Sequence, residues 1–220
     1  MINVIVAGGQ AENDFLKEFF AGYERGELYI IACDRGYDIC YDVGVTPNLV
    51  IGDFDSACAG AYTQVKSRGI NVILLNSEKD DSDSEAAVRY ILQHNELTGD
   101  IYLLGGIGSR IDHLLGNISL VAMGVQNGRR IFLMDSHNRI CGLGPGGRLV
   151  INRAGQYGKY ISVFPYMGRT SGVTLEGFKY PLRDAVLEGF DTLTVSNEII
   201  EEQGVIALVD GYLIIMETMD

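Results

Sequence analysis

The sequence contains no tryptophan, and its four cysteines form neither a Cys-x-x-Cys pair nor a zinc-ligand spacing. No site in the chain can therefore stack a ligand on an indole ring, and the cysteines are expected to stay as thiols in a reducing cytoplasm. No apolar run approaches the ~20 residues of a membrane-spanning helix. The first residues, MINVIVAGGQ, lack the leader of a signal peptide. We therefore expect a cytoplasmic chain.

Basic residues are also scarce: 17 Lys and Arg stand against 29 Asp and Glu, which gives a formal net charge of −12. Nucleic-acid binding depends on a basic surface, so neither nucleic acid nor a membrane is an expected partner. An acidic protein can still hold a polyphosphate if backbone N–H groups, a few local cations or a divalent metal ion offset the charge. With 47% hydrophobic and 21% charged residues, the composition is that of a folded globular protein.

The first part of the chain alternates short apolar, β-branched runs with segments of helical periodicity, such as Asp83–Asn95. Strands that are buried on both faces and separated by helices predict a parallel, doubly wound sheet in an α/β domain. In such sheets the ligand lies beyond the carboxyl ends of the strands. Five polar or glycine residues fall at these predicted ends: Asp34, Asp53, Asp55, Gly105 and Gly106.

After about Asn138 the helical periodicity is largely lost and short runs with tight turns follow, each of which predicts a strand, among them 159–167, 172–182 and 192–199. Asp210–Gly211 between two apolar runs is a strong hairpin signal. These features predict an all-β, sandwich-like second domain. The expected organisation is an α/β domain over residues 1–137 and a β-sandwich-like domain over 138–220.

Gly52-Asp53-Phe54-Asp55-Ser56 carries two carboxylates where a predicted strand ends. Residues i and i+2 of an extended chain point the same way, so Asp53 and Asp55 can share one cation. Mg²⁺ prefers one or two carboxylates together with waters and substrate phosphates. The simpler interpretation is an acidic turn that caps a helix.

Two further segments combine helix starts with charge. Lys79 to Glu85 places a lysine beside three aspartates, which suits a magnesium–polyphosphate, although Asp and Ser at a helix N-terminus also have a capping role. Gly105 to His113 is a glycine loop before an apolar helix, with Arg110 as a possible phosphate clamp. It matches neither a Walker A loop nor a dinucleotide motif, so a plain glycine turn is the alternative. Ser196-Asn197-Glu198 lies in an apolar context and by itself reads as a polar turn at a strand end.

Taken together, these segments resemble the thiamine pyrophosphokinases, the bacterial type in particular. The resemblance spans nearly the whole chain, and its motifs occur in the family's order: Asp34–Gly36, Pro47 with Gly52–Ser56, Lys79–Asp83, Gly105–His113 with Asn117, Gly172–Leu182, Ser196–Glu198 and Gly211–Leu213. It implies an α/β nucleotide-binding domain followed by a β domain, a homodimer, and thiamine bound near the subunit interface.

The resemblance also implies roles for single residues. Magnesium would be held by Asp53, Asp55 and Asp83, and the catalytic set would add Asp80 and Arg110. The ATP site would contain Asp34, Gly36, Lys79, Gly105, Gly106, Gly108, Arg110 and His113. Thiamine would be held by Asp112, Ser196 and Asn197, and Asn197 offers the donor and the acceptor that an aminopyrimidine requires.

The chain departs from the family pattern in three ways. Arg35 and Ser109 stand where glycines are usual, which adds bulk near the expected phosphates. Without tryptophan, an aromatic partner for thiamine would be Tyr166, Phe178 or Tyr180.

The implied reaction is an in-line attack of the thiamine hydroxyl on the β-phosphorus of ATP, with Mg²⁺, to give thiamine diphosphate and AMP. One alternative is a pyrophosphokinase for another hydroxymethyl heterocycle, such as a pterin, which the C-terminal domain would distinguish. The other is a non-catalytic nucleotide-binding sensor, which would not need the complete set of Asp53, Asp55, Asp83 and Arg110.

Overall fold

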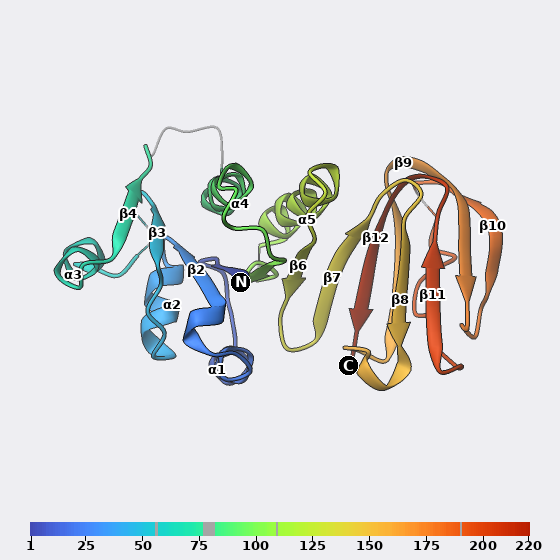
Figure 1. Ribbon diagram of the computed structural model, residues 1–220, viewed down its shortest axis with the longest axis horizontal. Coiled ribbons are helices and arrows are strands. Elements are labelled where there is room, and N and C mark those ends of the chain that lie inside the picture. The colour runs from blue at the N-terminus through green and yellow to red at the C-terminus, as the bar shows by residue number, and fades with distance from the viewer. Residues whose placement is uncertain (56, 77–81, 109, 190) are drawn as a thin grey trace. The chain divides into compact units, whose positions relative to one another are not determined.

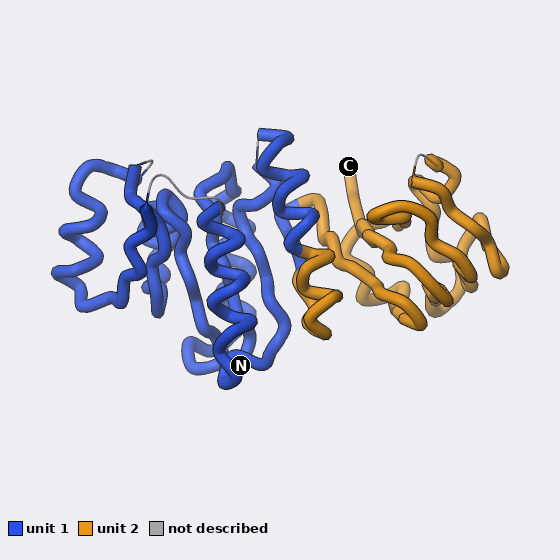
Figure 2. Tube along the Cα trace, turned by 90° about the horizontal axis from the view of Figure 1, so that it is seen from above, with its two compact units in different colours: residues 1–120, 132–136 blue, residues 121–131, 137–220 orange. Residues whose placement is uncertain are grey.

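The computed structural model describes residues 1–55, 57–76, 82–108, 110–189 and 191–220. The chain forms two compact units (Figure 2): residues 1–120 with 132–136, and residues 121–131 with 137–220. The chain passes from the first unit to the second inside helix α5 (Ile111–Gln126).

The first unit contains a sheet whose parallel strands have their carboxyl ends on the same side. Its strands lie in the order β4 (Asn71–Leu74), β3 (Leu49–Gly52), β2 (Leu28–Cys33), β1 (Ile2–Val6), β5 (Ile101–Leu104) and β6 (Ile131–Met134). The pairs β1–β2, β1–β5, β2–β3 and β3–β4 are all parallel. The side chains of β1, β2 and β3 are almost all buried, which explains why these strands consist of continuous apolar runs.

Helices cover both faces of this sheet (Figure 1). They are α1 (Asn13–Ala21), α2 (Gly36–Asp42), α3 (Ala61–Ser67), α4 (Asp83–Gln93) and α5, with a 3₁₀ turn at Arg25–Glu27. Helix α2 packs on β1 and β2, and α4 packs on β1, β2 and β3. Ser82 caps α4 by accepting a hydrogen bond from the Glu85 backbone N–H at 3.2 Å. The capping role expected for this segment is therefore present.

The second unit consists of antiparallel strands, in the order β7 (Asn138–Leu143), β12 (Asp210–Thr218), β9 (Tyr160–Glu176), β11 (Gln203–Ala207) and β8 (Arg148–Asn152), with a 3₁₀ turn at Arg153–Gly155. The sixth strand, β10 (Leu182–Leu187), pairs with β9. The first part of β9 pairs with β12, and its last part pairs with β10 and β11. The long strand therefore joins two sets of strands.

The expected combination of helices with parallel strands, followed by further strands, is present, whereas several element boundaries differ from the predicted ones. The runs 159–167 and 172–182 predicted separate strands, whereas the structure has β9, which continues through Met167 and Gly168 despite their positive φ. The run 192–199 predicted a strand, whereas it contributes only isolated bridges. Ser196, with φ of +57°, interrupts the extended backbone there.

No helix in the described part of the chain has the length and apolar character to span a membrane. The four cysteines all lie in described segments and form no disulfide.

Candidate active site

Three carboxylates meet at the carboxyl ends of two neighbouring strands. Asp34 follows β2, and Asp53 and Asp55 follow β3. These strands are parallel, with Cys33 opposite Ile51, so their ends lie side by side. One carboxylate oxygen from each of the three aspartates lies within 4.8 Å of the others. Asp34 is buried, and Asp55 is exposed. The group is therefore open to solvent on one side.

Two residues near this group adopt a left-handed backbone, which costs energy for any side chain other than glycine. Asp34 has φ of +46° and Phe54 has φ of +62°. The Phe54 ring packs edge-on against Tyr62 of α3, with ring centroids 5.3 Å apart. The Asp55 backbone N–H donates to Asp53 Oδ1 at 3.1 Å. These contacts hold the turn that brings the carboxylates of Asp53 and Asp55 together.

The carboxylates repel one another, which makes a cation favourable at this position. The pKa of Asp55 is raised, first by the negative charge of Asp53 and then by loss of hydration and by the charge of Asp34. A divalent cation bound by all three oxygens would remove this repulsion. Mg²⁺ takes oxygen ligands and is usually held by one or two carboxylates, so this group contains enough ligands for the metal that the sequence predicts.

A cavity of about 920 Å³ lies beside Asp34, at the ends of β1, β2 and β5. Two glycine loops form much of its wall, Gly8–Gly9 after β1 and Gly105–Gly108 after β5. A Cβ atom on Gly9 would lie 2.3 Å from the Gly105 carbonyl oxygen, so only glycine allows the loops to approach this closely. The side chain of Asn117 in α5 donates to the Gly106 carbonyl at 2.8 Å and fixes the second loop.

Charged side chains of the first turn of α5 complete the wall. Arg110 and Asp112 form a two-pronged ion pair, with Nη2–Oδ2 at 2.6 Å and Nε–Oδ1 at 3.2 Å. The hydrogen bond from Arg110 lowers the pKa of Asp112 to about 2, so the pair stays ionised at physiological pH. Both residues line the cavity, next to His113.

Most of the residues that the sequence predicted for the ATP site line this cavity: Asp34, Gly105, Gly106, Gly108, Arg110 and His113, together with Asp83 and Asp112. Gly36 is not among the lining residues; it begins α2 and packs against β1. Lys79 and Asp80 lie outside the described residues. Arg35, a departure from the family pattern, also lines the cavity.

The loop after β1 was not among the predicted site segments. Gly8, Gly9, Gln10 and Asn13 all line the cavity. The signal was present, because Ala7-Gly8-Gly9-Gln10 follows the first predicted strand and ligands gather at the carboxyl ends of such strands.

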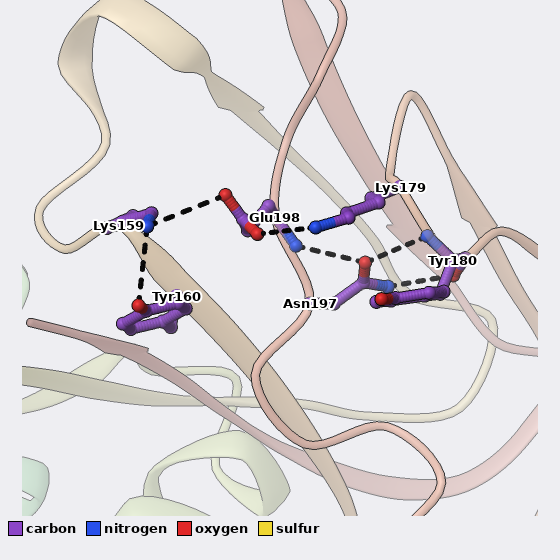
Figure 3. A network of polar contacts seen from close by, with 6 residues as sticks. All are labelled: Lys159, Tyr160, Lys179, Tyr180, Asn197 and Glu198. Atoms are coloured by element: carbon purple, nitrogen blue, oxygen red, sulfur yellow. Dashed lines mark hydrogen bonds and ion pairs between the residues drawn. The ribbon is translucent and has the colours of Figure 1, made fainter.

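Ser196 and Asn197, which were predicted to hold thiamine, lie in the second unit. Ser196 is exposed, and its backbone N–H donates to Ser162 Oγ at 2.9 Å. Asn197 is 3% exposed, and its side chain contacts backbone groups of Tyr180 and Glu198 (Figure 3).

Comparison with known proteins agrees with the resemblance seen in the motifs. The family model described as "Thiamin pyrophosphokinase, catalytic domain" matches residues 21–133, and the one described as "Thiamin pyrophosphokinase, vitamin B1 binding domain" matches residues 148–213. Thiamine pyrophosphokinase of Bacillus subtilis (strain 168) is 33% identical over 217 residues, which cover 98% of each chain. The chain belongs to the thiamine pyrophosphokinase family. It is therefore an enzyme, a diphosphotransferase, and neither alternative activity is favoured.

Solved structures of the family have the same fold. The crystal structure of the B. subtilis thiamine pyrophosphokinase covers 100% of this chain and 99% of its own, with a TM-score of 0.87 and 31% identity. That of the Geobacillus thermodenitrificans thiamin pyrophosphokinase covers 100% and 98%, with a TM-score of 0.85 and 28% identity.

Proposed function

We propose that this enzyme transfers the pyrophosphoryl group of ATP to thiamine, producing thiamine diphosphate and AMP, with Mg²⁺ bound by Asp34, Asp53 and Asp55. The observation that carries the proposal is the position of Asp34. Its carboxylate belongs to the group of three, and the same residue lines the glycine-walled cavity. A metal ion at the carboxylates would thus lie beside a bound polyphosphate.

The cavity supplies what an acidic protein needs to hold ATP. Its glycine loops allow backbone N–H groups to approach phosphate oxygens closely, and the first turn of α5 adds the partial positive charge of a helix N-terminus. Arg110 adds a permanent cation. We retain Lys79 as a further phosphate contact and Asp80 and Asp83 as catalytic aspartates on the strength of the family motif.

In the reaction, the primary hydroxyl of thiamine loses its proton to solvent, and its oxygen forms a bond to the β-phosphorus of ATP. The bond between that phosphorus and the oxygen bridging to the α-phosphorus breaks, and AMP leaves with the electron pair. Bound magnesium would neutralise charge on the phosphate oxygens. The protein's own contribution is to position the two substrates and to hold Arg110 and the loop N–H groups against the polyphosphate.

Thiamine is assigned to the second unit because the vitamin B1 binding model matches residues 148–213. Ser196, which is exposed there, is a proposed contact, and the family motif adds Asp112. We further propose the domain division 1–137 and 138–220, with a sandwich-like second domain, and a homodimer with thiamine near its interface. These finer assignments are supported by the family motifs.

The activity is tested by incubating the full chain with ATP, Mg²⁺ and thiamine and separating the products. The proposal expects thiamine diphosphate and AMP in equal amounts. Thiamine monophosphate with ADP would instead indicate transfer of a single phosphoryl group, and turnover only with a pterin alcohol would indicate the other substrate class. Either result would overturn the proposed reaction.

The metal site is tested with Asp55→Asn and the matched control Asp14→Asn, which removes one charge from the exposed start of α1. We expect Asp55→Asn to lower kcat about a hundredfold or more, because it removes a charge-stabilising group. It should also weaken binding of Mn²⁺, measured by electron paramagnetic resonance without substrates. The control should do neither. Normal Mn²⁺ affinity in Asp55→Asn would remove this residue from the metal site.

A further inference from the structure

Asn197 joins three segments of the second unit (Figure 3). Its side-chain Oδ1 accepts hydrogen bonds from the backbone N–H groups of Tyr180 and Glu198, both at 3.0 Å. Its Nδ2 donates to the Tyr180 carbonyl at 2.8 Å. Its backbone exchanges two hydrogen bonds with Ile161 of β9, at 2.8 and 3.0 Å. The residue therefore connects β9, the 178–180 segment and its own segment.

The register of the chain explains why a side chain makes these contacts. Phe178 and Ile199 form an antiparallel bridge, which places Tyr180 opposite Asn197. The backbone N–H and C=O of Asn197 are already bonded to Ile161 and cannot also serve Tyr180. The side-chain amide supplies the missing acceptor and donor. Among side chains of this length only asparagine carries both, because aspartate has no donor when ionised.

The side-chain amide of Asn197 has little hydrogen-bonding capacity left for a ligand. The oxygen accepts two hydrogen bonds and the nitrogen donates one, and the residue is 3% exposed. By contrast, the two segments that it joins carry exposed groups. Tyr180 is 60% exposed, and no other aromatic residue is exposed among the described residues of the region matched as vitamin B1 binding. Ser196 is exposed on the other segment.

Ion pairs surround the amide but have a smaller role. Glu198 binds Lys179 at 3.0 Å and Lys159 at 3.9 Å, and the Lys179 ammonium lies 5.6 Å from the centroid of the Tyr180 ring. Both lysine side chains are about half exposed or more, at 49% and 60%. Exposed pairs of this kind contribute little to stability. The buried amide, together with the backbone hydrogen bond from the Lys179 N–H to the Glu198 carbonyl at 2.9 Å, therefore fixes how Tyr180 lies relative to Ser196.

We propose that Asn197 is a positioning residue for substrate binding: its amide fixes the Tyr180 backbone relative to Ser196, and it makes no contact with thiamine itself. The inference rests on the proposed function, which assigns thiamine to this unit. It differs from the role that the family motif suggests for Asn197, which is a direct hydrogen bond to the aminopyrimidine.

Substrate analogues separate the two roles. Dissociation constants of thiamine, and of the analogue with an oxo group in place of the 4′-amino group, are measured for wild type and Asn197→Ala, with Mg²⁺ and α,β-methylene-ATP present. A positioning residue predicts a loss of about tenfold or more for both ligands, in the same ratio. A direct contact predicts that the loss largely disappears with the analogue, and that result would overturn the proposal.

A double-mutant cycle tests whether Asn197 acts through Tyr180. If it does, Asn197→Ala should weaken thiamine binding much less in a Tyr180→Ala background than in wild type. Asn197→Asp keeps the acceptor for two N–H groups and should fall between wild type and alanine. Asn152→Ala, an exposed asparagine of β8, is the matched control and should bind thiamine normally. Additive losses would contradict action through Tyr180.

Hydrogen exchange supplies a readout that needs no ligand. In Asn197→Ala, the backbone amides of Tyr180 and Glu198 should exchange faster while amides of β12 stay protected. Unchanged exchange at these two amides would overturn the inference, as would a lowered melting temperature with unchanged thiamine affinity. Failure of the proposed function looks different, because wild type would then neither bind thiamine nor form thiamine diphosphate.

Discussion

Among single residues, Arg110 is the proposed phosphate contact that lines the cavity, and it keeps its charge at any physiological pH. Asp112 orients its guanidinium through Nε and Nη2. The same hydrogen bond raises the pKa of Arg110 further. The ion pair uses Nε and Nη2, so Nη1 is not involved in it. The N–H groups of Nη1 can then donate to phosphate oxygens.

Replacing Arg110 with alanine should therefore affect one substrate more than the other. A charge-assisted hydrogen bond contributes roughly 1.5–3 kcal/mol, which corresponds to about tenfold or more in the KM for ATP. The KM for thiamine should change much less. Arg89→Ala is the control, since Arg89 carries the same charge in α4 but pairs with Glu85 outside the cavity lining. Equal increases in both KM values would contradict a phosphate role for Arg110.

Residue patterns predicted part of this site. Asp53 and Asp55 were paired from the sequence on the assumption of extended backbone, in which residues i and i+2 point the same way. The structure brings them together through a turn at Phe54, whose φ is +62°. The proximity of Asp34 depends on β2 and β3 being neighbours, which no local pattern reveals. The sequence instead grouped Asp83 with the pair, and that role stays a prediction. For Asn197, the polar character was visible, but the hydrogen bonds of its backbone to Ile161 were not.

At the scale of elements, Asp34 lies between the end of β2 and the start of α2. The contact of α2 with β1 therefore helps to position it. Gly36 begins α2, and a Cβ atom there would lie 2.0 Å from the Val6 carbonyl oxygen. The atoms that a Cβ on Gly36 would meet belong to the backbone, so no flexible side chain could move aside. The glycine therefore sets how closely the helix can approach the sheet, which explains the residue without a direct contact to ATP.

Gly36→Ala provides a test in which two effects have opposite signs. Helix propensity alone would make alanine more stable by up to about 1 kcal/mol. The clash with Val6 should outweigh this and lower the free energy of unfolding by roughly 1–3 kcal/mol. Gly26→Ala is the control, because nothing lies within 4 Å of its added Cβ. Urea unfolding of both variants shows whether the free energy of unfolding rises or falls. A stabilised Gly36→Ala variant would show that α2 moves without cost.

The sequence predicted whether a segment forms a helix or a strand better than it predicted where that element begins and ends. The apolar runs that became β1 to β6, and the helical periodicity that became α4 and α5, were recognisable because burial on one or two faces leaves a period in the sequence. Strands β7 and β10 were not foreseen, because both are partly exposed and show little alternation. The order of the strands is a long-range property and needed the structure.

For the whole molecule, charge is the property that constrains function most. The chain has a formal net charge of −12. Among the described residues, the cavity wall follows this bias: it contains Asp34, Asp42, Asp83 and Asp112, and its arginines are Arg35 and Arg110. Such a wall would repel ATP that is not neutralised, and the divalent cation proposed above would offset that repulsion.

The two units can be followed separately through their cysteines. Burial raises the pKa of Cys40 in α2 and of Cys141 in β7 to about 12, so neither forms a reactive thiolate in the native protein at pH 8. Cys40 belongs to the first unit and Cys141 to the second, whereas Cys58 is exposed. Alkylation at pH 8 should therefore modify Cys58 without denaturant, slowly because hydrogen bonding to Asp38 raises its pKa, while Cys40 and Cys141 stay protected.

In a urea series analysed by peptide mass spectrometry, we expect Cys40 and Cys141 to become reactive over the same range of concentration. The reason is that α5 begins in one unit and ends in the other, so the loss of either unit removes packing from a helix that both share. Unfolding restores the ordinary thiol pKa, so each cysteine reports the opening of its own unit. If Cys141 were modified at a urea concentration that leaves Cys40 protected, the second unit would unfold alone, and α5 would not couple the two.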